Sequence, residues 1–358
     1  IYFSPSTPPP PIYIYSIYCI DTNDPAINLF IFDINCSPMS SPILKLNTGH
    51  DIPGLGFGTW DPRYPEKAYD ATLHALHAGY RHLDCAALYI NEELVGKAIH
   101  EFLESRPDVQ RKDLFITTKV WNHMHEPEDV EASIKESLRK LRLDYVDLYL
   151  LHYPVATVKD EKGGEAVGAD GKYIVKRELT ENPEPTWRAM EKVARDGLTR
   201  AIGVSNWSVS RLRSLLKFAS IPPATNQIEI HPFFPNTKVV QFCFDHGILP
   251  VAYSPLGSQV LTCGEAEKAR GQQALRDIAT RKGCDIGQIL IAWGLRRGYS
   301  VIPKSFTKSR ITSNFQRVEL TDEEFKAIGD APGGKYTRFV DLSVEYSYDN
   351  FWADEEDR

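Results

Sequence analysis

The chain has 358 residues, of which 42% are hydrophobic and 25% charged, and its formal net charge is −7. This composition is ordinary for a soluble globular protein, and an acidic chain without a long basic run argues against nucleic acid or an anionic membrane as the main partner. No apolar stretch approaches the roughly 18 residues of a membrane span, which argues against an integral membrane protein.

The first 38 residues differ in composition from the rest of the chain. They contain seven prolines and no lysine or arginine, and the first methionine of the chain is Met39. The apolar stretch Ala26–Phe32 is short and follows no basic residue, which argues against a secretory signal. We therefore expect translation to start at Met39 and residues 1–38 to be poorly ordered upstream or non-native sequence. Residues 39–358 are expected to form a single domain.

Short apolar runs of strand-forming residues alternate with helix-like stretches from Leu44 onward. The runs are Leu55–Trp60, Arg81–Asp84, Leu114–Val120, Val146–His152, Arg200–Val204, Thr225–Ile230, Leu249–Tyr253 and Ser300–Pro303. Near-continuous apolar strands separated by helices indicate a parallel sheet that is buried on both faces. Eight such units predict an α/β fold of the closed (β/α)8 type, the TIM barrel, with active-site groups at the carboxyl ends of the strands.

The stretches between the runs have helical periodicity. In Pro127–Arg142 the apolar residues recur from Val130 at spacings of four, four and three, which places them on one face of a helix. The other helices are expected at Tyr69–His77, Glu92–Phe102, Trp187–Asp196, Ser210–Phe218, Lys238–Asp245 and Gln288–Arg296, with extra helical segments at Glu265–Arg281 and Asp322–Asp330.

Two further segments are expected at opposite ends of the barrel. Ile43–Ile52 is typical of a β-hairpin with its turn at Asn47-Thr48-Gly49, and such a hairpin could plug the barrel floor. The polar loop Ala156–Glu184 follows the fourth strand and would overhang the mouth. Together with the insert 258–275 and the C-terminal tail 335–358, this loop is where we expect substrate specificity to lie.

Polar residues with acid-base chemistry stand at the ends of the predicted strands: Asp84, Lys119 and His152, with Tyr89 five residues after the aspartate. Tyrosine has an ordinary pKa of about 10, and a neighbouring ammonium lowers this pKa because it stabilises the tyrosinate. A buried tyrosine backed by a lysine and a carboxylate is therefore expected to donate a proton near neutral pH. Other residues at the strand ends are Thr59, Trp60, Ser205, Asn206, Gln227, Tyr253 and Lys304.

Eight short segments, taken in their order, resemble the aldo-keto reductases over Pro42–Arg338. They are GFGTW at 56–60, YRHLDCAALYINEELVGKAI at 80–99, TTKVWN at 117–122, LDYVDLYLLHYP at 143–154, IGVSNW at 202–207, NQIEIHP at 226–232, AYSPLGS at 252–258 and IPKS at 302–305. The chain is similar in particular to aldehyde reductases of the aldose, xylose and glycerol dehydrogenase type found in fungi. The resemblance implies a catalytic tetrad made of Asp84, Tyr89, Lys119 and His152. In it, Tyr89 protonates the developing alkoxide and His152 orients the carbonyl.

The resemblance also implies an extended nicotinamide dinucleotide bound across the barrel mouth, although the sequence has no Rossmann fingerprint. The implied contacts are Thr59 and Trp60; Ser205, Asn206 and Gln227 on the carboxamide; Tyr253 on the nicotinamide ring; Ser254, Leu256 and Ser258 on the pyrophosphate; Lys304, Ser305, Thr307 and Arg310 on the 2′-phosphate; and Asn314 near the adenine. A lysine and an arginine on one dianion favour NADPH over NADH. Many relatives have a glutamate where this chain has Ser313, which leaves one adenine contact in doubt.

The implied substrate pocket is aromatic and consists of Trp60, Trp121 and Tyr153. Many relatives have a tryptophan where this chain has Tyr153, and a phenol at this place adds a group that can form hydrogen bonds. The pocket therefore suggests short polar aldehydes, sugars or sugar acids as substrates.

We expect an NADPH-dependent reductase of small aldehydes or ketones that needs no metal. One alternative is a non-catalytic NADPH-binding regulatory subunit of the same fold, and NADPH oxidation would separate the two. The other is a metal-dependent barrel hydrolase using Asp84, His152 and His231, which metal analysis would test; we interpret His231, before Pro232, as structural. The six cysteines form no CxxC pair, which indicates free thiols in a reducing compartment. We expect a monomer or weak homodimer in the cytoplasm.

Overall fold

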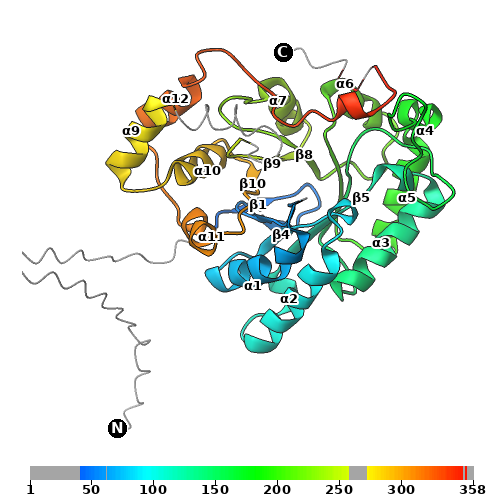
Figure 1. Cartoon of the computed structure of the whole chain (residues 1–358), viewed down its shortest axis with the longest axis horizontal. Helices are drawn as coiled ribbons and strands as arrows, with labels where there is room; N and C mark the ends of the chain where they lie inside the picture. Colours follow the sequence, from blue (N-terminus) through cyan, green and yellow to red (C-terminus); the bar gives the residue numbers. More distant parts are fainter. Residues whose placement is uncertain (1–40, 62, 258–271, 350, 353–358) are drawn as a thin grey trace, which may run out of the picture. The chain divides into compact units, whose positions relative to one another are not determined.

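A computed structural model of the chain describes residues 41–61, 63–257, 272–349 and 351–352. The predicted upstream segment 1–38 lies outside the described residues. So do residues 258–271, which include Ser258, most of the insert 258–275 and the start of the predicted helix Glu265–Arg281. At the centre is an eight-stranded sheet in which every neighbouring pair is parallel and the strands follow their order in the chain (Figure 1). The strands are β3 (Phe57–Gly58), β4 (His82–Asp84), β5 (Phe115–Val120), β6 (Leu148–Leu151), β7 (Ile202–Ser205), β8 (Thr225–Glu229), β9 (Leu249–Tyr253) and β10 (Ser300–Val301).

Backbone hydrogen bonds join the first strand of this sheet to the last. The amide of Gly56 donates to the carbonyl of Val301 at 2.9 Å, and the amide of Val301 donates to the carbonyl of Gly54 at 2.7 Å. Each of the eight predicted runs overlaps one of the strands. The sheet fits the predicted (β/α)8 barrel.

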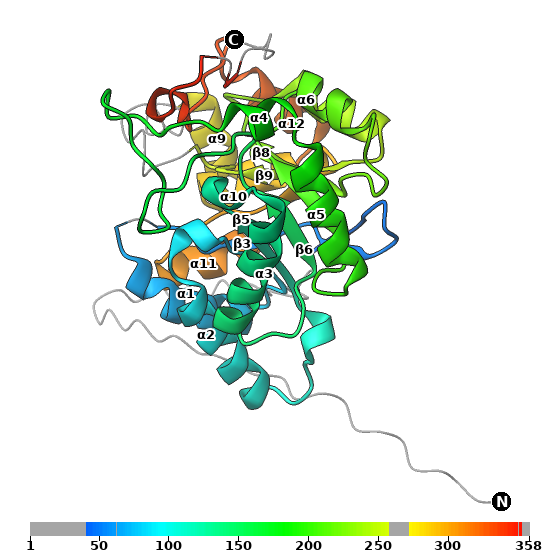
Figure 2. The same cartoon turned by 90° about the vertical axis from the view of Figure 1, so that its right-hand side faces the viewer.

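Helices surround the sheet in Figures 1 and 2. They are α1 (Ala68–Ala78), α2 (Glu92–Ser105), α3 (Pro127–Leu141), α4 (Arg177–Glu181), α5 (Glu184–Arg195), α6 (Val209–Leu215), α7 (Thr237–Asp245), α9 (Gln273–Lys282), α10 (Ile286–Arg296), α11 (Lys308–Phe315) and α12 (Asp322–Asp330). Helix α3 has Pro127 in its first turn, acidic residues beside it, basic residues in its last turn and a left-handed cap at Arg142 (φ 58°), all of which favour these helix ends. The sequence did not predict α4 and α11, which are short. Among the described residues, none of the helices is long and apolar enough to cross a membrane.

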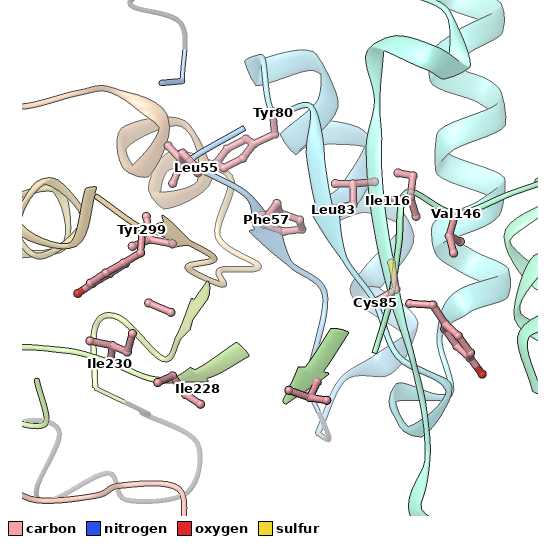
Figure 3. Packing of buried hydrophobic residues seen from close by; sticks show 14 of the residues in the cluster. Leu55, Phe57, Tyr80, Leu83, Cys85, Ile116, Val146, Ile228, Ile230 and Tyr299 are labelled. Carbon is pink, nitrogen blue, oxygen red and sulfur yellow. The ribbon is translucent and has the colours of Figure 1, made fainter. Parts of the chain in front are cut away.

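Side chains alternate between the two faces of each strand, as the period of two requires. Phe57, Leu83 and Ile116 stand at one level of three adjacent strands and belong to the main hydrophobic cluster, which also contains helix residues (Figure 3). Phe115 of β5 and Leu148 of β6 lie on the opposite, inward face of the sheet and belong to a separate, smaller cluster. Because positions two apart share a face, the inward face of β5 that begins with Phe115 ends at Lys119.

The predicted N-terminal hairpin is present as β1 (Ile43–Lys45) and β2 (Asp51–Pro53), which pair antiparallel. Its turn contains Gly49 at φ +82°, a left-handed conformation that glycine adopts at little cost. Leu46 and Ile52 of the hairpin are buried in the smaller cluster with the inward residues of the strands.

The long loop after β6 and the C-terminal tail contact each other. The loop folds back on itself through isolated bridges such as Thr157 with Val175, and Tyr173 of the loop pairs with Tyr346 of the tail. Figures 1 and 2 show the tail, coloured red, on the same side of the barrel as α4. The loop and tail therefore lie together at one end of the barrel.

Candidate active site

The ammonium group of Lys119 is the centre of a buried cluster at the carboxyl ends of β4 and β5. Its Nζ donates to Asp84 Oδ2 at 2.6 Å, to the carbonyl of Cys85 at 2.8 Å and to the phenolic oxygen of Tyr89 at 3.2 Å. These contacts occupy all three donors of the ammonium, and the Lys119 side chain is 0% exposed. The phenolic oxygen accepts from Lys119, so the phenol's own proton is free to point toward another acceptor.

Tyr89 differs from the sequence-based expectation in its pKa. Burial raises this pKa well above the ordinary value, and the negative charge of Asp84 acts in the same direction. The sequence predicted that Lys119 would lower it toward neutrality, and this prediction was wrong because it left out the desolvation of the phenolate. Tyr89 therefore keeps its proton at neutral pH and can give it only to a strong base such as an alkoxide.

His152 follows β6 and lies beside Tyr89. The two ring centroids are 5.7 Å apart, and the edge contact with Trp121 is at 5.0 Å. Burial and then the charge of Lys119 lower the pKa of His152 well below its ordinary value, so the imidazole is neutral at neutral pH. Its Nδ1 is buried and has no hydrogen-bond partner within the described part of the chain. A neutral imidazole next to the phenol can orient a carbonyl oxygen without adding charge.

The residues assigned to the nicotinamide lie against this cluster and bond to one another. Ser205 donates to the carbonyl of Gln227 at 2.8 Å, and Asn206 Nδ2 donates to the carbonyl of His152 at 3.0 Å. Gln227 Nε2 donates to Asp84 Oδ1 at 2.7 Å, and the hydroxyl of Tyr253 donates to Asn206 Oδ1 at 2.8 Å. The structure thus brings together this predicted set and the tetrad in one connected network.

Asn206 of the nicotinamide set and Ser254 of the implied pyrophosphate set have backbone conformations that are uncommon outside glycine. Asn206 has φ +64° and Ser254 has φ +48°. Left-handed non-glycine residues are concentrated at functional sites, where the surrounding structure holds them in place. At Asn206 the hydrogen bonds to His152 and Tyr253 provide that support.

The predicted phosphate-binding residues are located around the first turn of α11. The hydroxyl of Ser305 accepts the amide of Thr307 at 3.1 Å, and the guanidinium of Arg310 donates to the Thr307 hydroxyl at 2.9 Å. Arg310 and Thr307 are exposed. A helix N-terminus with an exposed arginine suits a phosphate group.

Lys304 is engaged in an ion pair that the sequence did not reveal. Its Nζ donates to Asp61 Oδ2 at 2.9 Å, and Asp61 is 5% exposed. Burial raises the pKa of Asp61, but the hydrogen bonds and charges of Lys304 and Arg63 together outweigh burial, so the net shift of this pKa is downward. A phosphate bound by Lys304 would have to share this lysine with the carboxylate.

The remaining members of the cofactor set include Asn314, Leu256 and Thr59. Asn314 is buried, and a Cβ on Gly287 would come within 3.2 Å of its Oδ1 and within 3.7 Å of a methyl group of Leu256. Leu256 is partly buried against the main core. Thr59 is buried, and both its amide and its hydroxyl donate to the carbonyl of Asp84.

Trp121 and Tyr153 of the implied substrate pocket belong to a buried aromatic cluster that has more members than the sequence predicted. The ring centroids of Trp60 and Tyr89 are 6.2 Å apart, and those of Trp121 and Tyr153, which meet edge to face, are 5.9 Å apart. Tyr153 also contacts Phe351 of the tail at 5.8 Å. The aromatic residues missed by the sequence reasoning are Tyr346, Tyr348, Phe351 and Trp352. The density of aromatic residues in YSYDNFW at 346–352 was the signal that could have indicated them.

Trp121 also contacts an acidic residue of the long loop. Its indole Nε1 donates to Glu165 Oε2 at 2.8 Å, and Thr157 donates to the other oxygen of the same carboxylate at 2.8 Å. Burial raises the pKa of Glu165 despite these two bonds. Loop and pocket are therefore joined through polar contacts as well as packing.

The proposed metal ligands of the hydrolase alternative have other partners. Asp84 is bonded to Lys119, and His231 Nε2 lies 2.9 Å from Glu229. Among the described residues, no group of three or more histidine, cysteine, aspartate or glutamate side chains is placed to hold a metal ion.

A parallel eight-stranded barrel with a buried lysine, aspartate and histidine at the strand ends and a half-buried tyrosine beside them defines a class of oxidoreductase that reduces carbonyl groups. The model of the aldo/keto reductase family matches residues 54–331. The chain belongs to the aldo/keto reductase family.

Named relatives cover most of the chain. A glycerol 2-dehydrogenase (NADP(+)) of Hypocrea jecorina is 53% identical over 89% of this chain and 100% of its own length. The aldehyde reductase YPR1 of Saccharomyces cerevisiae is 41% identical over 81% of this chain and 91% of its own. Among solved structures, the aldose reductase of Schistosoma japonicum has a TM-score of 0.79 at 35% identity, covering 88% of this chain and 99% of that one. An aldo-keto reductase of Bombyx mori in complex with NADP has a TM-score of 0.75 at 33% identity, covering 87% and 99%.

Proposed function

We propose that this protein reduces an aldehyde or ketone to the alcohol with NADPH, and that Tyr89 supplies the proton. The observation that carries the proposal is the position of the phenolic oxygen 3.2 Å from the fully buried Lys119 ammonium and beside the neutral His152. The named relatives are reductases and dehydrogenases, and nothing in these comparisons favours the non-catalytic alternative.

The residues of the site divide the reaction between them. A nicotinamide dinucleotide, when bound, would supply the hydride that the carbonyl carbon needs. His152 orients the carbonyl oxygen, and as that oxygen becomes an alkoxide Tyr89 transfers its proton to it, which gives the neutral alcohol and a tyrosinate. Lys119 stabilises the tyrosinate until Tyr89 is protonated again. Asp84 fixes the orientation of the Lys119 ammonium by accepting a hydrogen bond from it at 2.6 Å.

The cofactor proposal rests on the chemistry of the donor set. Ser205, Asn206 and Gln227 together offer the donors and acceptors that a carboxamide needs, and an aromatic ring is present at Tyr253. The exposed Arg310 at the start of α11 would bind the 2′-phosphate. The relatives that carry NADP in their names support the same choice.

The substrate class proposed is a short polar aldehyde, a sugar or a sugar acid. Its support is the aromatic cluster around the Tyr153 phenol, together with relatives described as acting on glycerol and aldehydes. The direct test is to follow NADPH consumption with a panel of aldehydes, keto acids and aldoses. Absence of NADPH consumption with every member, in protein that binds NADPH, would contradict the proposal.

Three wider expectations belong to the same proposal. Residues 39–358 would form one domain, which the grouping of Pro38–Arg358 into a compact unit supports. The hairpin β1–β2 would plug the barrel floor, which its burial against the inward strand residues supports. A location in the cytoplasm would fit the free buried thiols of Cys85 and Cys243, and we propose a monomer or weak homodimer there.

The raised pKa of Tyr89 predicts how each direction of the reaction depends on pH. A raised pKa keeps the phenol protonated to higher pH, so reduction should change little between about pH 6 and about pH 9. Alcohol oxidation needs the tyrosinate, so its kcat/KM should rise nearly tenfold per pH unit across the same range. Neutral His152 adds no second titration, because its pKa is lowered. A plateau of the oxidation rate near neutral pH would show that the Tyr89 pKa is lowered in the working enzyme.

Arg310→Ala should weaken NADPH binding by about tenfold or more, since a charge-assisted contact is worth roughly 1.5–3 kcal/mol. NADH binding should hardly change, because NADH has no 2′-phosphate. Lys304 is already paired with Asp61, so it should compensate poorly for the lost arginine. Fluorescence titration with both dinucleotides measures this, and Lys308→Ala, an exposed cation of the same helix, is the charge-matched control. Equal losses for NADPH and NADH would place Arg310 elsewhere than on the 2′-phosphate.

A further inference from the structure

Glu229 is a fully buried carboxylate at the carboxyl end of β8. It stands two positions after Gln227, so the two side chains lie on the same inward face of the strand. Gln227 contacts the catalytic cluster through Asp84. Glu229 therefore lies one step further toward the mouth of the barrel than the residue assigned to the nicotinamide.

Both oxygens of this carboxylate bind backbone amides of the C-terminal tail. Oε1 accepts the amide of Phe339 at 2.8 Å, and Oε2 accepts the amide of Val340 at 2.9 Å. His231 adds a second hold, because its Nε2 is 2.9 Å from Glu229 Oε1 and its ring stacks on Phe339 at 4.9 Å. The tail is thus attached to the barrel at a charged and buried point.

Beyond this point the tail forms part of the aromatic pocket. The Tyr346 hydroxyl accepts a hydrogen bond from Asn122 Nδ2 at 2.8 Å. Asn122 directly follows Trp121 in the chain. Phe351 contacts Tyr153 at 5.8 Å and Tyr346 at 5.2 Å. The tail therefore packs directly against Tyr153 of the implied substrate pocket.

We propose that Glu229, supported by His231, is a positioning residue that holds tail residues 337–349, 351 and 352 against Trp121 and Tyr153 of the implied substrate pocket and thereby sets the size of aldehyde that can enter. This inference rests on the proposed function for the identity of the pocket. A carboxylate offers acceptors to both tail amides, whereas a glutamine offers one oxygen and one NH₂ group. Glu229→Gln therefore faces one tail amide with a donor and leaves that amide unsatisfied.

The kinetic test compares a three-carbon hydroxyaldehyde with an aromatic aldehyde such as naphthaldehyde. In Glu229→Gln the ratio of kcat/KM should shift by about tenfold toward the aromatic aldehyde, mainly through KM, because the pocket loses its outer wall. The dissociation constant of NADPH should stay within about twofold. Glu345→Gln removes an equal charge from an exposed position of the same tail and should leave the ratio unchanged.

A second readout does not depend on activity. Trypsin can cut the bond between Arg338 and Phe339, whose amide Glu229 holds. This cleavage, followed by mass spectrometry, should be at least about tenfold faster in Glu229→Gln than in the wild type, because cutting requires local opening of the tail. Faster cleavage in a protein that reduces no aldehyde would uphold the anchoring and refute the proposed function instead.

Val340→Pro removes one of the two tail amides without touching the barrel and should reproduce both effects. If Glu229→Gln fails to fold, Val340→Pro still tests whether the bonds between Glu229 and the tail amides hold the tail in place. An unchanged aldehyde ratio with unchanged cleavage would overturn the proposal. So would equal losses for both aldehydes accompanied by weaker NADPH binding, because Glu229 would then act through Gln227 and the cofactor.

Discussion

Replacing Tyr89 by phenylalanine should lower turnover in aldehyde reduction by about 10²–10⁴-fold, the range that general acid catalysis contributes. The substitution removes the phenolic oxygen that accepts from Lys119 and with it the proton for the alkoxide. Phenylalanine keeps the ring contacts with Trp60 and His152, so the fold and NADPH affinity should be nearly unchanged. Single-turnover reduction and a separate NADPH titration measure the two quantities.

Tyr80→Phe is the matched control for this experiment. Tyr80 is fully buried, and its hydroxyl donates to the carbonyl of Ile311 at 3.3 Å, in the main core and outside the catalytic cluster. It should lose a little stability and keep its turnover. If Tyr89→Phe retained more than about a third of wild-type turnover, another group would have to be the acid.

The positions of the residues proposed to be catalytic could be predicted because they depend on a strong and local pattern. Asp84, Lys119 and His152 each end an apolar run of strand-forming residues, and parallel strands of a barrel present their carboxyl ends on one face. The side-chain period of two then decides which residues point inward. The structure brings these residues together as the sequence predicted.

The contacts that the sequence did not predict join distant segments that lack periodicity. Lys304 and Asp61 are 243 positions apart, and Val340 and Glu229 are 111 apart, so no local pattern relates them. The prediction of a lowered pKa for Tyr89 was wrong for a different reason. A sequence shows which charges are near one another in a motif, but the desolvation that outweighs them depends on the packing around the phenol.

Lys119→Met should be the most destabilising of these substitutions, by about 3–5 kcal/mol of unfolding free energy, as is typical when one partner of a buried ion pair is removed. The Lys119 side chain is 0% exposed and that of Asp84 is 3% exposed, so water can hydrate the abandoned carboxylate only slightly. Gln227 would remain as its partner at 2.7 Å, which is a neutral donor and replaces the ammonium only in part.

The double variant Asp84→Asn with Lys119→Met separates the charge from the packing. Methionine has nearly the length of the lysine stem and asparagine the shape of aspartate, so the pair loses both charges but little volume. Its unfolding free energy, measured by denaturant titration, should recover most of the loss, because no unpaired charge stays buried. Turnover should stay low in both variants, since neither has an ammonium to stabilise the tyrosinate after Tyr89 gives up its proton. A double variant no more stable than Lys119→Met would mean that the lysine stem, rather than the ion pair, holds this end of the barrel together. A double variant with restored turnover would mean that Lys119 serves only to neutralise Asp84, and that Tyr89 donates its proton without help.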